Sequence, residues 1–422
     1  MDQKPYSKEH FEIIGKDLIS FVASVVLAIL TGLGVGAYAS LFGLLVNWAT
    51  GFRQSHMWLI FLLPAGGAAI ILAYHLCRVN NPRGTNRVLE SISSGEKIPL
   101  VMAPLITFST ALTHFLGGSA GREGAAIQIG GSLGMWFGRS LRLNPRRVTI
   151  MTLCGISAAF SALFGTPLTA AIFAMEVISI GIMHYSAIVP CAVSSLTALF
   201  VSKSLGLSGF GFDSITFPDF TWKMGVKSIV LGIMCALVGI LFCIILHRSE
   251  HFAKKYISNQ YLRAITGALL VIMLTIIVGN SDYNGLGTDI IKSAVEGTAL
   301  PYAFFLKMVF TAVTLAACFK GGEIVPTIFI GATFGCVFGP LIGVPASAGA
   351  ALGICGVFCA VTNCPITSIM MSFELFGISG LPMFLITAAV SYRLSGYYGL
   401  YTGQKIVYSK SQPKFINRTT HE

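Results

Sequence analysis

Apolar, almost uncharged stretches alternate with short charged segments along nearly the whole chain. The stretches cover residues 18–52, 57–77, 98–121, 148–175, 177–202, 228–248, 264–281 and 324–373. About 20 apolar residues, folded as a helix, span the roughly 30 Å hydrocarbon layer of a bilayer. The first and last stretches are longer than one span needs, so each must hold either a long tilted helix or several helices joined by short uncharged turns. The pattern predicts an all-α, polytopic membrane protein.

Composition and charge agree with this prediction. Of the 422 residues, 54% are hydrophobic and only 11% are charged, whereas soluble domains carry about 25% charged residues. The net charge of +11 gathers around residues 78–87, 139–147 and 405–418. Positive loops favour the cytoplasmic side, so we expect multi-pass insertion in the plasma membrane with both termini, 1–17 and 404–422, in the cytosol. Because the charge flanks apolar spans, we expect no nucleic-acid partner.

The two halves of the chain repeat one pattern. The segment TALT at 110–113 recurs as TAVT at 311–314, and IQIGGSLGMWFG at 127–138 recurs in the same register as IFIGATFGCVFG at 328–339. A little further on, Pro167, Thr169 and Glu176 match Pro365, Thr367 and Glu374. Matches in register over both halves predict an internal duplication, with repeats at 18–210 and 211–403.

Each predicted repeat contains interruptions within apolar sequence. A glycine-rich break lies at 117–124 in the first half and at 321–326 in the second, and Pro167 and Pro365 mark a second break. Duplicated membrane halves commonly pack as inverted repeats, with the transport site where broken helices meet. Tight helix packing is the alternative explanation for glycines, and it accounts for the spacing of Gly130, Gly134 and Gly138. It does not explain charged residues at the breaks.

Two glutamates occupy these breaks. Glu123 lies in Gly121-Arg122-Glu123-Gly124, and Glu323 holds the corresponding place in the second half. An ionisable side chain at bilayer depth costs about 2.5–3.5 kcal/mol or more, which makes it a functional candidate. A helix start favours negative charge through its free N–H groups and its dipole. A small anion could therefore replace the carboxylate after it takes up a proton, although each glutamate could instead be a static cap.

The sequence contains no strong motif for metal binding or catalysis. The ten cysteines form no CxxC pair, and the eight histidines include no HExxH motif, so we predict no metal site, no cofactor and no enzyme. We expect ion pairs to hold Glu176 and Glu374. Tyr401 alone would be assigned to the interfacial belt of aromatic residues; its hydroxyl matters only if the chain turns inward after the last span.

These motifs resemble those of the CLC family of chloride channels and proton-coupled anion antiporters. Residues 121–124 are similar to the family's GREGP segment, whose glutamate is the gate, and 322–326 resemble its GxFxP segment. Arg83-Gly84-Thr85-Asn86-Arg87 stands where the family has GSGIP, and Tyr401 falls at its anion-site tyrosine. The resemblance covers nearly the whole chain.

The resemblance implies a homodimer in which each subunit has its own pore. Glu123 would be the gating, proton-carrying residue and Glu323 a second proton-handling glutamate. Backbone N–H groups and hydroxyls would bind the anion. The implied anion-binding residues are Thr85, Asn86, Gly121, Arg122, Gly124, Ala125, Ile324, Val325 and Tyr401.

Departures from the family pattern point to one branch. Ala125 replaces the proline after GREG, Glu323 replaces an apolar residue, and Val177 replaces the internal proton-transfer glutamate of chloride antiporters. This set resembles the fluoride-exporting branch, so we expect fluoride/proton exchange. Because the hydroxyl of Thr85 resembles the serine of chloride members, a chloride/proton antiporter and a passive chloride channel stay as alternatives.

Overall fold

The computed structural model describes residues 8–79, 84–207, 209–212, 215–412 and 414–420. Within them the first half of the chain forms α1 (Lys8–Ser55), α2 (Leu63–Leu76), α3 (Thr85–Ser94), α4 (Met102–Phe115), α5 (Glu123–Ser140), α6 (Pro145–Phe164), α7 (Pro167–Glu176) and α8 (Ile188–Ser204). The second half forms α9 (Trp222–Tyr256), α10 (Gln260–Val278), α11 (Thr288–Val295), α12 (Ala303–Ala316), α13 (Ile324–Leu341), α14 (Ala346–Thr362), α15 (Pro365–Phe376) and α16 (Leu381–Leu394). Short 3-10 helices are η1 (Met57–Leu62), η2 (Tyr185–Ala187) and η3 (Ile378–Gly380). Arg83 lies outside the described residues.

The order of the helices confirms the predicted duplication. Each half runs from a long first helix, α1 or α9, through a second span to a short helix, α3 or α11. Helices α5 and α13 have 18 residues each and begin at the repeated glycine-rich breaks. The proline breaks also recur, with Pro167 opening α7 and Pro365 opening α15.

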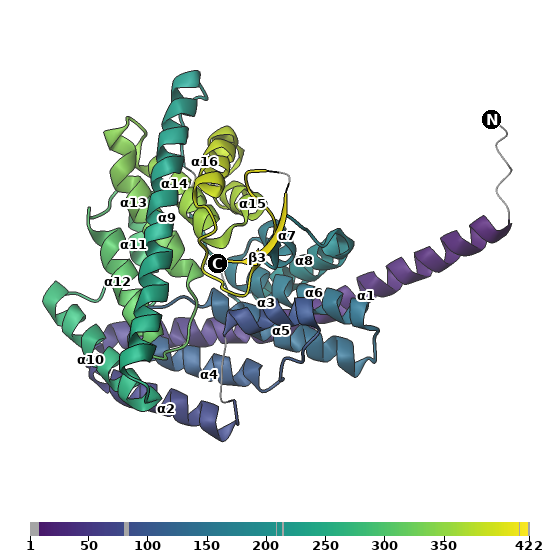
Figure 1. Ribbon diagram of the computed structural model, residues 1–422, viewed down its shortest axis with the longest axis horizontal. Coiled ribbons are helices and arrows are strands. Elements are labelled where there is room, and N and C mark those ends of the chain that lie inside the picture. Colours follow the sequence, from purple (N-terminus) through teal and green to yellow (C-terminus); the bar gives the residue numbers. More distant parts are fainter. Residues whose placement is uncertain (1–7, 80–83, 208, 213–214, 413, 421–422) are drawn as a thin grey trace.

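The two longest apolar stretches resolve in different ways. Residues 18–52 lie within α1, a single helix of 48 residues that begins at Lys8, inside the segment assigned to the N-terminal end. Figure 1 shows this helix reaching well beyond the body of the molecule. Residues 324–373 instead divide into α13, α14 and α15. In the described part of the chain, seven helices are long and apolar enough to cross a membrane, which agrees with the predicted polytopic fold.

Glycines bring paired helices into backbone contact around the core. A Cβ on Gly130 of α5 would lie 2.3 Å from the carbonyl oxygen of Gly155 in α6. In the second half, a Cβ on Gly331 of α13 would lie 2.5 Å from the carbonyl oxygen of Gly353 in α14. Larger side chains would force these helices apart, so the packing explanation for the regularly spaced glycines is confirmed.

A small sheet joins the C-terminal tail to the first half. Strand β1 (Ser179–Ile180) pairs in parallel with β2 (Lys405–Tyr408), which pairs antiparallel with β3 (Phe415–Thr419). The sheet was not predicted from the sequence, and it sets the course of the chain just after the last helix. We call the side of the molecule that carries this sheet the tail side (Figure 1).

Candidate anion and proton site

The two glycine-rich breaks meet at the centre of the molecule. The N–H of Gly121 donates to the carbonyl of Gly322 at 2.6 Å, and the N–H of Gly322 donates to the carbonyl of Gly121 at 2.7 Å. This antiparallel bridge places the first turns of α5 and α13 beside each other. The contact is possible because neither residue has a side chain: a Cβ on Gly322 would lie 2.3 Å from the backbone nitrogen of Gly124.

Glu123 is the first residue of α5 and is fully buried. Its Oε2 accepts the backbone N–H of Arg122 at 3.0 Å, whereas Oε1 has no hydrogen-bond partner and lies 3.5 Å from the Arg122 Nε. The carboxylate therefore accepts a hydrogen bond from a backbone N–H at the start of a helix, where the helix dipole favours negative charge. This is the arrangement expected of a side chain that an anion could replace.

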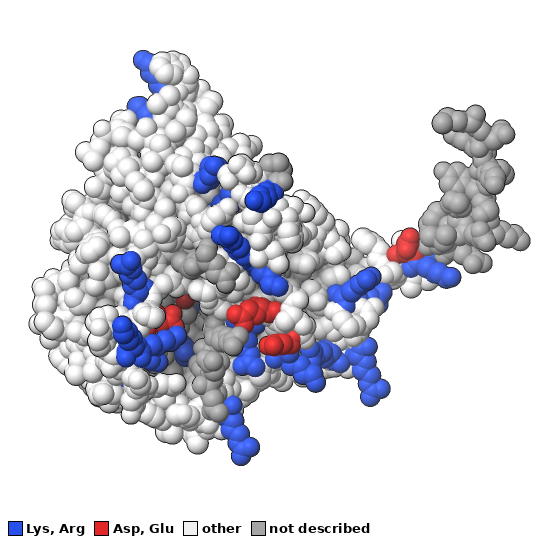
Figure 2. All heavy atoms as spheres, in the orientation of Figure 1, with Lys and Arg blue, Asp and Glu red and all other residues white. Residues whose placement is uncertain are grey.

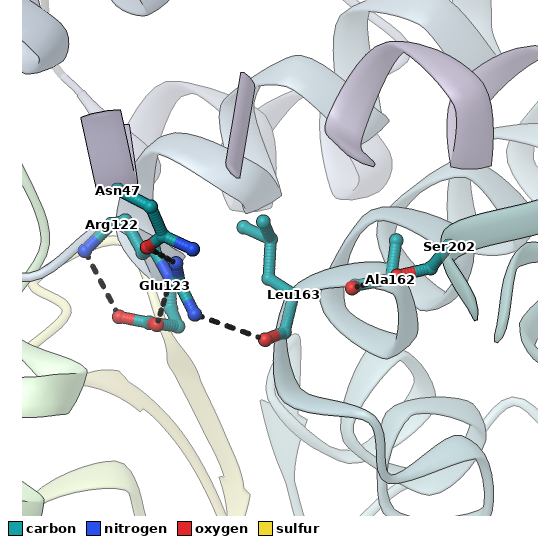
Figure 3. Close-up of polar contacts among 6 residues, drawn as sticks. All are labelled: Asn47, Arg122, Glu123, Ala162, Leu163 and Ser202. Atoms are coloured by element: carbon teal, nitrogen blue, oxygen red, sulfur yellow. Dashed lines mark hydrogen bonds and ion pairs between the residues drawn. The ribbon is translucent and has the colours of Figure 1, made fainter. Parts of the chain in front are cut away.

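The guanidinium of Arg122 is held in place by two other helices (Figure 3). Its Nη1 donates to Asn47 Oδ1 in α1 at 2.7 Å, and its Nη2 donates to the carbonyl of Leu163 near the end of α6 at 3.3 Å. Asn47 was not predicted as a site residue. The signal available in the sequence is an amide within the long apolar stretch 18–52.

Glu323 occupies the N-cap position of α13, where its side chain makes no capping hydrogen bond, and it faces the first half of the chain. A Cβ on Gly124 would lie 3.4 Å from Glu323 Oε2 and 3.4 Å from Thr85 Oγ1. The carboxylate of α13, the hydroxyl at the start of α3 and the first turn of α5 therefore converge on one point. Within the described ranges Glu323 Oε2 is buried without a hydrogen-bond partner, and Thr85 donates to the carbonyl of Gly124 at 3.3 Å.

A cavity of about 470 Å³ opens from this point toward the tail side. Its inner lining includes Thr85, Gln128, Glu323 and Tyr401. Tyr401 is only 2% exposed, and its hydroxyl has no hydrogen-bond partner among the residues that the structure describes. Gln128 was missed in the sequence; it donates from Nε2 to the carbonyl of Gly124 at 3.2 Å, and its Oε1 is unpartnered. Its signal is a polar residue in an otherwise apolar and small-residue helix.

The C-terminal tail explains why Tyr401 points inward. After α16 the backbone N–H of Leu400 donates to the carbonyl of Val361 at 2.8 Å, and Thr420 donates from its hydroxyl to the carbonyl of Tyr401 at 2.6 Å. Asn86 accepts the backbone N–H of Gly403 at 3.0 Å. Tyr401 is therefore a buried cavity residue rather than an interfacial one, and Asn86 lines the cavity while it positions the turn.

The predicted backbone donors need one correction. The N–H of Gly121 is engaged by the carbonyl of Gly322, so it is removed from the set that could hold an anion. First-turn N–H groups have no acceptor inside their own helix. In α5 these include Gly124 and Ala125, and in α13 Ile324 and Val325. The N–H of Arg122 becomes available when the carboxylate of Glu123 moves away.

The predicted ion pairs of Glu176 and Glu374 are wrong. Glu176 instead accepts the backbone N–H groups of Ile366 and Thr367 at the start of α15. Glu374 reciprocates by accepting the N–H groups of Leu168 and Thr169 at the start of α7. Both glutamates therefore cap helices, which is a structural role, as predicted, with different partners.

Val177 lies in fully buried surroundings at the end of α7. Its carbonyl accepts the side-chain amide of Gln404 at 3.0 Å, and the same amide nitrogen donates to the carbonyl of Thr362. The side-chain amide of Gln404, a residue of the C-terminal tail, therefore occupies the space next to the Val177 carbonyl. Of the two glutamates at the helix starts, Glu323 faces the tail-side cavity.

Known proteins show similarity over nearly the whole chain. A chloride/fluoride channel protein of Pseudomonas syringae pv. tomato is 36% identical over 404 residues, covering 93% of this chain and 89% of that protein. The crystal structure of a CLC-type fluoride/proton antiporter superposes with a TM-score of 0.88 at 33% identity, covering 92% of this chain and 98% of that one. A slow cyanobacterial Cl⁻/H⁺ antiporter shares the fold, with a TM-score of 0.74 at 19% identity, over 88% of this chain and 94% of that one.

The family assignment follows from the same comparison of sequences. Residues 65–396 match the family described as Voltage gated chloride channel. This range includes both glycine-rich breaks, both glutamates and all the helices between α3 and α15. The chain therefore belongs to the voltage-gated chloride channel (CLC) family of polytopic ion channels and transporters, with the family's two inverted repeats and broken helices.

Proposed function

We propose that this protein exchanges small anions for protons and that fluoride is the anion it exports. The observation that carries the proposal is the meeting of two glutamates at joined helix starts. Glu123 is buried and accepts a backbone N–H, whereas Glu323 is half-buried and lines a cavity. The names of two similar proteins, a chloride/fluoride channel protein and a fluoride/proton antiporter, support the choice of anion.

In the proposed cycle, Glu123 and the anion compete for the same donors. Protonation removes the charge of the carboxyl group, so its attraction to the helix start weakens and it leaves the N–H of Arg122. An anion then binds the free first-turn N–H groups of α5 and α13 together with the hydroxyls of Thr85 and Tyr401. When Glu123 loses its proton and returns, it displaces the anion. Glu323, which faces the cavity, is the proton-handling group on the tail side.

The size of the site bears on which anion is transported. Fluoride is smaller and more strongly hydrated than chloride, so its site must return more hydrogen-bond energy to replace the lost water. Here a tyrosine hydroxyl, a threonine hydroxyl and an amide line one cavity beside Glu323. Chloride/proton exchange is the second candidate, because the hydroxyl of Thr85 stands where chloride-transporting relatives have a serine. A passive chloride channel is the third.

The complete assembly we propose is a homodimer in the plasma membrane, with both termini in the cytoplasm and one pore in each subunit. The repeats would span 18–210 and 211–403, with cytosolic ends at 1–17 and 404–422. On this orientation the tail-side cavity opens to the cytoplasm.

Ion flux from proteoliposomes tests the proposal. Vesicles loaded with fluoride or with chloride are diluted into anion-free buffer, and the anion and the external pH are recorded with electrodes. We expect fluoride efflux to exceed chloride efflux and to move protons in the opposite direction, even against a proton gradient. Chloride efflux with no preference for fluoride contradicts the choice of anion, and anion efflux without proton movement indicates a channel.

A further inference from the structure

Lys320 lies at the mouth of the tail-side cavity and has no role in the cycle described above. It directly precedes the glycine-rich break at 321–326 and lies three residues ahead of Glu323. Its side chain lines both the 470 Å³ cavity that leads to Glu323 and an adjoining cavity of about 140 Å³. Lys320 therefore borders the same cavity as Thr85 and Glu323 without belonging to their point of convergence.

The other charged groups around these cavities already have partners or lie elsewhere on the wall. On α9, Lys254 pairs with Glu250 at 2.5 Å, and on α10 Arg263 donates to the Sγ of Cys318 at 2.8 Å. Glu90 of α3 and His247 of α9 line the larger cavity. Figure 2 shows basic side chains spread over the face on which β3 lies, with few acidic ones among them.

Lys320 differs from these neighbours because no carboxylate pairs with it. Within the described part of the chain it forms no ion pair, and its recorded contact is with the ring of Tyr74, whose centroid lies 5.1 Å from Nζ. Tyr74 is itself 5% exposed, so the ammonium group lies over the face of a buried aromatic ring. The carboxylate of Glu250 lines the same two cavities and attracts Lys320, but it is hydrogen-bonded to Lys254. Lys320 is therefore a cation without an ion pair of its own, which favours the binding of an anion.

We propose that Lys320 forms an outlying anion-binding site at the mouth of the tail-side cavity, which gathers small monovalent anions before they reach Glu323, Thr85 and Tyr401. This inference rests on the proposed anion transport. It adds Lys320 as a residue that sets the apparent affinity of the protein for the transported anion. A cavity with low-dielectric walls concentrates the field of a single charge. Within one Debye length, about 8 Å at physiological ionic strength, such a charge changes local anion binding by roughly three- to tenfold.

The test compares Lys320→Gln with Lys320→Arg and a matched lysine. Lys223→Gln is the control, because Lys223 is exposed at the opposite end of α9 from Lys254. Initial rates of fluoride transport are measured in proteoliposomes against fluoride concentration, at low and high ionic strength. We expect Lys320→Gln to raise the half-saturating fluoride concentration about three- to tenfold at low ionic strength, with little change in the maximal rate. Lys320→Arg should behave as the wild type.

Titration calorimetry of the detergent-solubilised proteins with sodium fluoride gives a readout that does not depend on transport. Lys320→Gln should bind fluoride more weakly by the same factor. Equal half-saturation and equal affinity in Lys320→Gln and the wild type would overturn the inference, as would the same loss in Lys223→Gln. A wild type that binds fluoride through Lys320 but moves neither fluoride nor chloride contradicts the proposed function and leaves the binding site supported.

Discussion

The carboxylate of Glu176 caps the start of α15 through Thr367, whose backbone N–H and hydroxyl lie 2.8 and 2.6 Å from Oε2. Glu374 repeats the arrangement in the opposite direction, with the N–H and hydroxyl of Thr169 at 2.8 and 2.5 Å. Each half of the chain therefore satisfies the free donors of a helix in the other half. These contacts hold α7 against α15. They lie on the same side of the core as the pairing of β1 with β2 of the C-terminal tail.

Removing one of these caps should weaken the fold. In Glu176→Ala the N–H groups of Ile366 and Thr367 lose a charged acceptor, which costs about 1–3 kcal/mol. The expected result is a lower thermal unfolding midpoint in detergent, followed by intrinsic fluorescence, and Glu374→Ala should show a similar loss. Glu296→Ala, at an exposed helix end, is the control. A midpoint for Glu176→Ala equal to that of the control would show that the cap contributes nothing.

Glu123→Gln should abolish proton movement. The amide keeps the shape of the side chain but cannot take up or release a proton, so the exchange step is lost even if anions still pass. The measurement is the external pH of proteoliposomes during fluoride efflux, with Glu296→Gln as the exposed control. Undiminished proton pumping by Glu123→Gln would remove this residue from the proposed role.

Glu323→Gln should reduce coupled transport at least about tenfold, equivalent to roughly 1.4 kcal/mol. Its Oε2 is buried without a partner beside Thr85 and Gly124, so the carboxylate has no structural bond at that atom to explain its presence. Paired fluoride and proton fluxes are the measurement, and the elution profile on size exclusion checks the fold. Coupled fluoride and proton fluxes equal to those of the wild type would show that Glu323 has no part in the exchange.

Gly322→Ala should disrupt the junction of the two breaks. The new Cβ would lie 2.3 Å from the backbone nitrogen of Gly124, so the bridge with Gly121 must be strained, and overpacking of this kind costs about 1–3 kcal/mol. We expect a lower unfolding midpoint together with loss of fluoride flux. Gly51→Ala, in α1 with no atom within 4 Å of the new Cβ, should retain both properties. Wild-type flux in Gly322→Ala would show that the junction tolerates rearrangement.

Tyr401→Phe should weaken fluoride binding by roughly tenfold, because one hydrogen bond to a charged ligand is lost. The aromatic ring remains to fill the buried position, so the fold should be unaffected. Titration calorimetry with fluoride measures the change, and Tyr398→Phe, at a partly exposed position, is the comparison. Equal affinity in Tyr401→Phe and the wild type would exclude the hydroxyl as an anion donor.

The repeats and the breaks could be predicted from the sequence because their signals are local. Glycine, proline and glutamate interrupt apolar stretches at matching places in each half, and α5, α7, α13 and α15 begin at those residues. The internal division of residues 324–373 was left open, since long apolar sequence fits one helix or several. The turn at Asn363, which has a left-handed conformation, separates two of those helices.

The contacts between distant residues could not be predicted from the same signals. Arg122 finds Asn47 across 75 positions, and Glu176 finds Thr367 across 191. Nothing in the local sequence around Glu176 or Glu374 distinguishes a carboxylate that caps a distant helix from one that forms an ion pair. The tail strand Lys405–Tyr408 is similar: its partner, Ser179–Ile180, is only two residues long, too short to give a periodic pattern.

The hydrogen-bonded pair Gly121–Gly322 has a consequence for how the protein moves. Separating the starts of α5 and α13 would leave four peptide groups unpaired in a region shielded from water, at several kcal/mol for each group. Rocking of one half against the other is therefore disfavoured at this point. For the proposed exchange we therefore expect the centre of the molecule to stay in place, with access changing through rotation of side chains, above all those of Glu123 and Glu323.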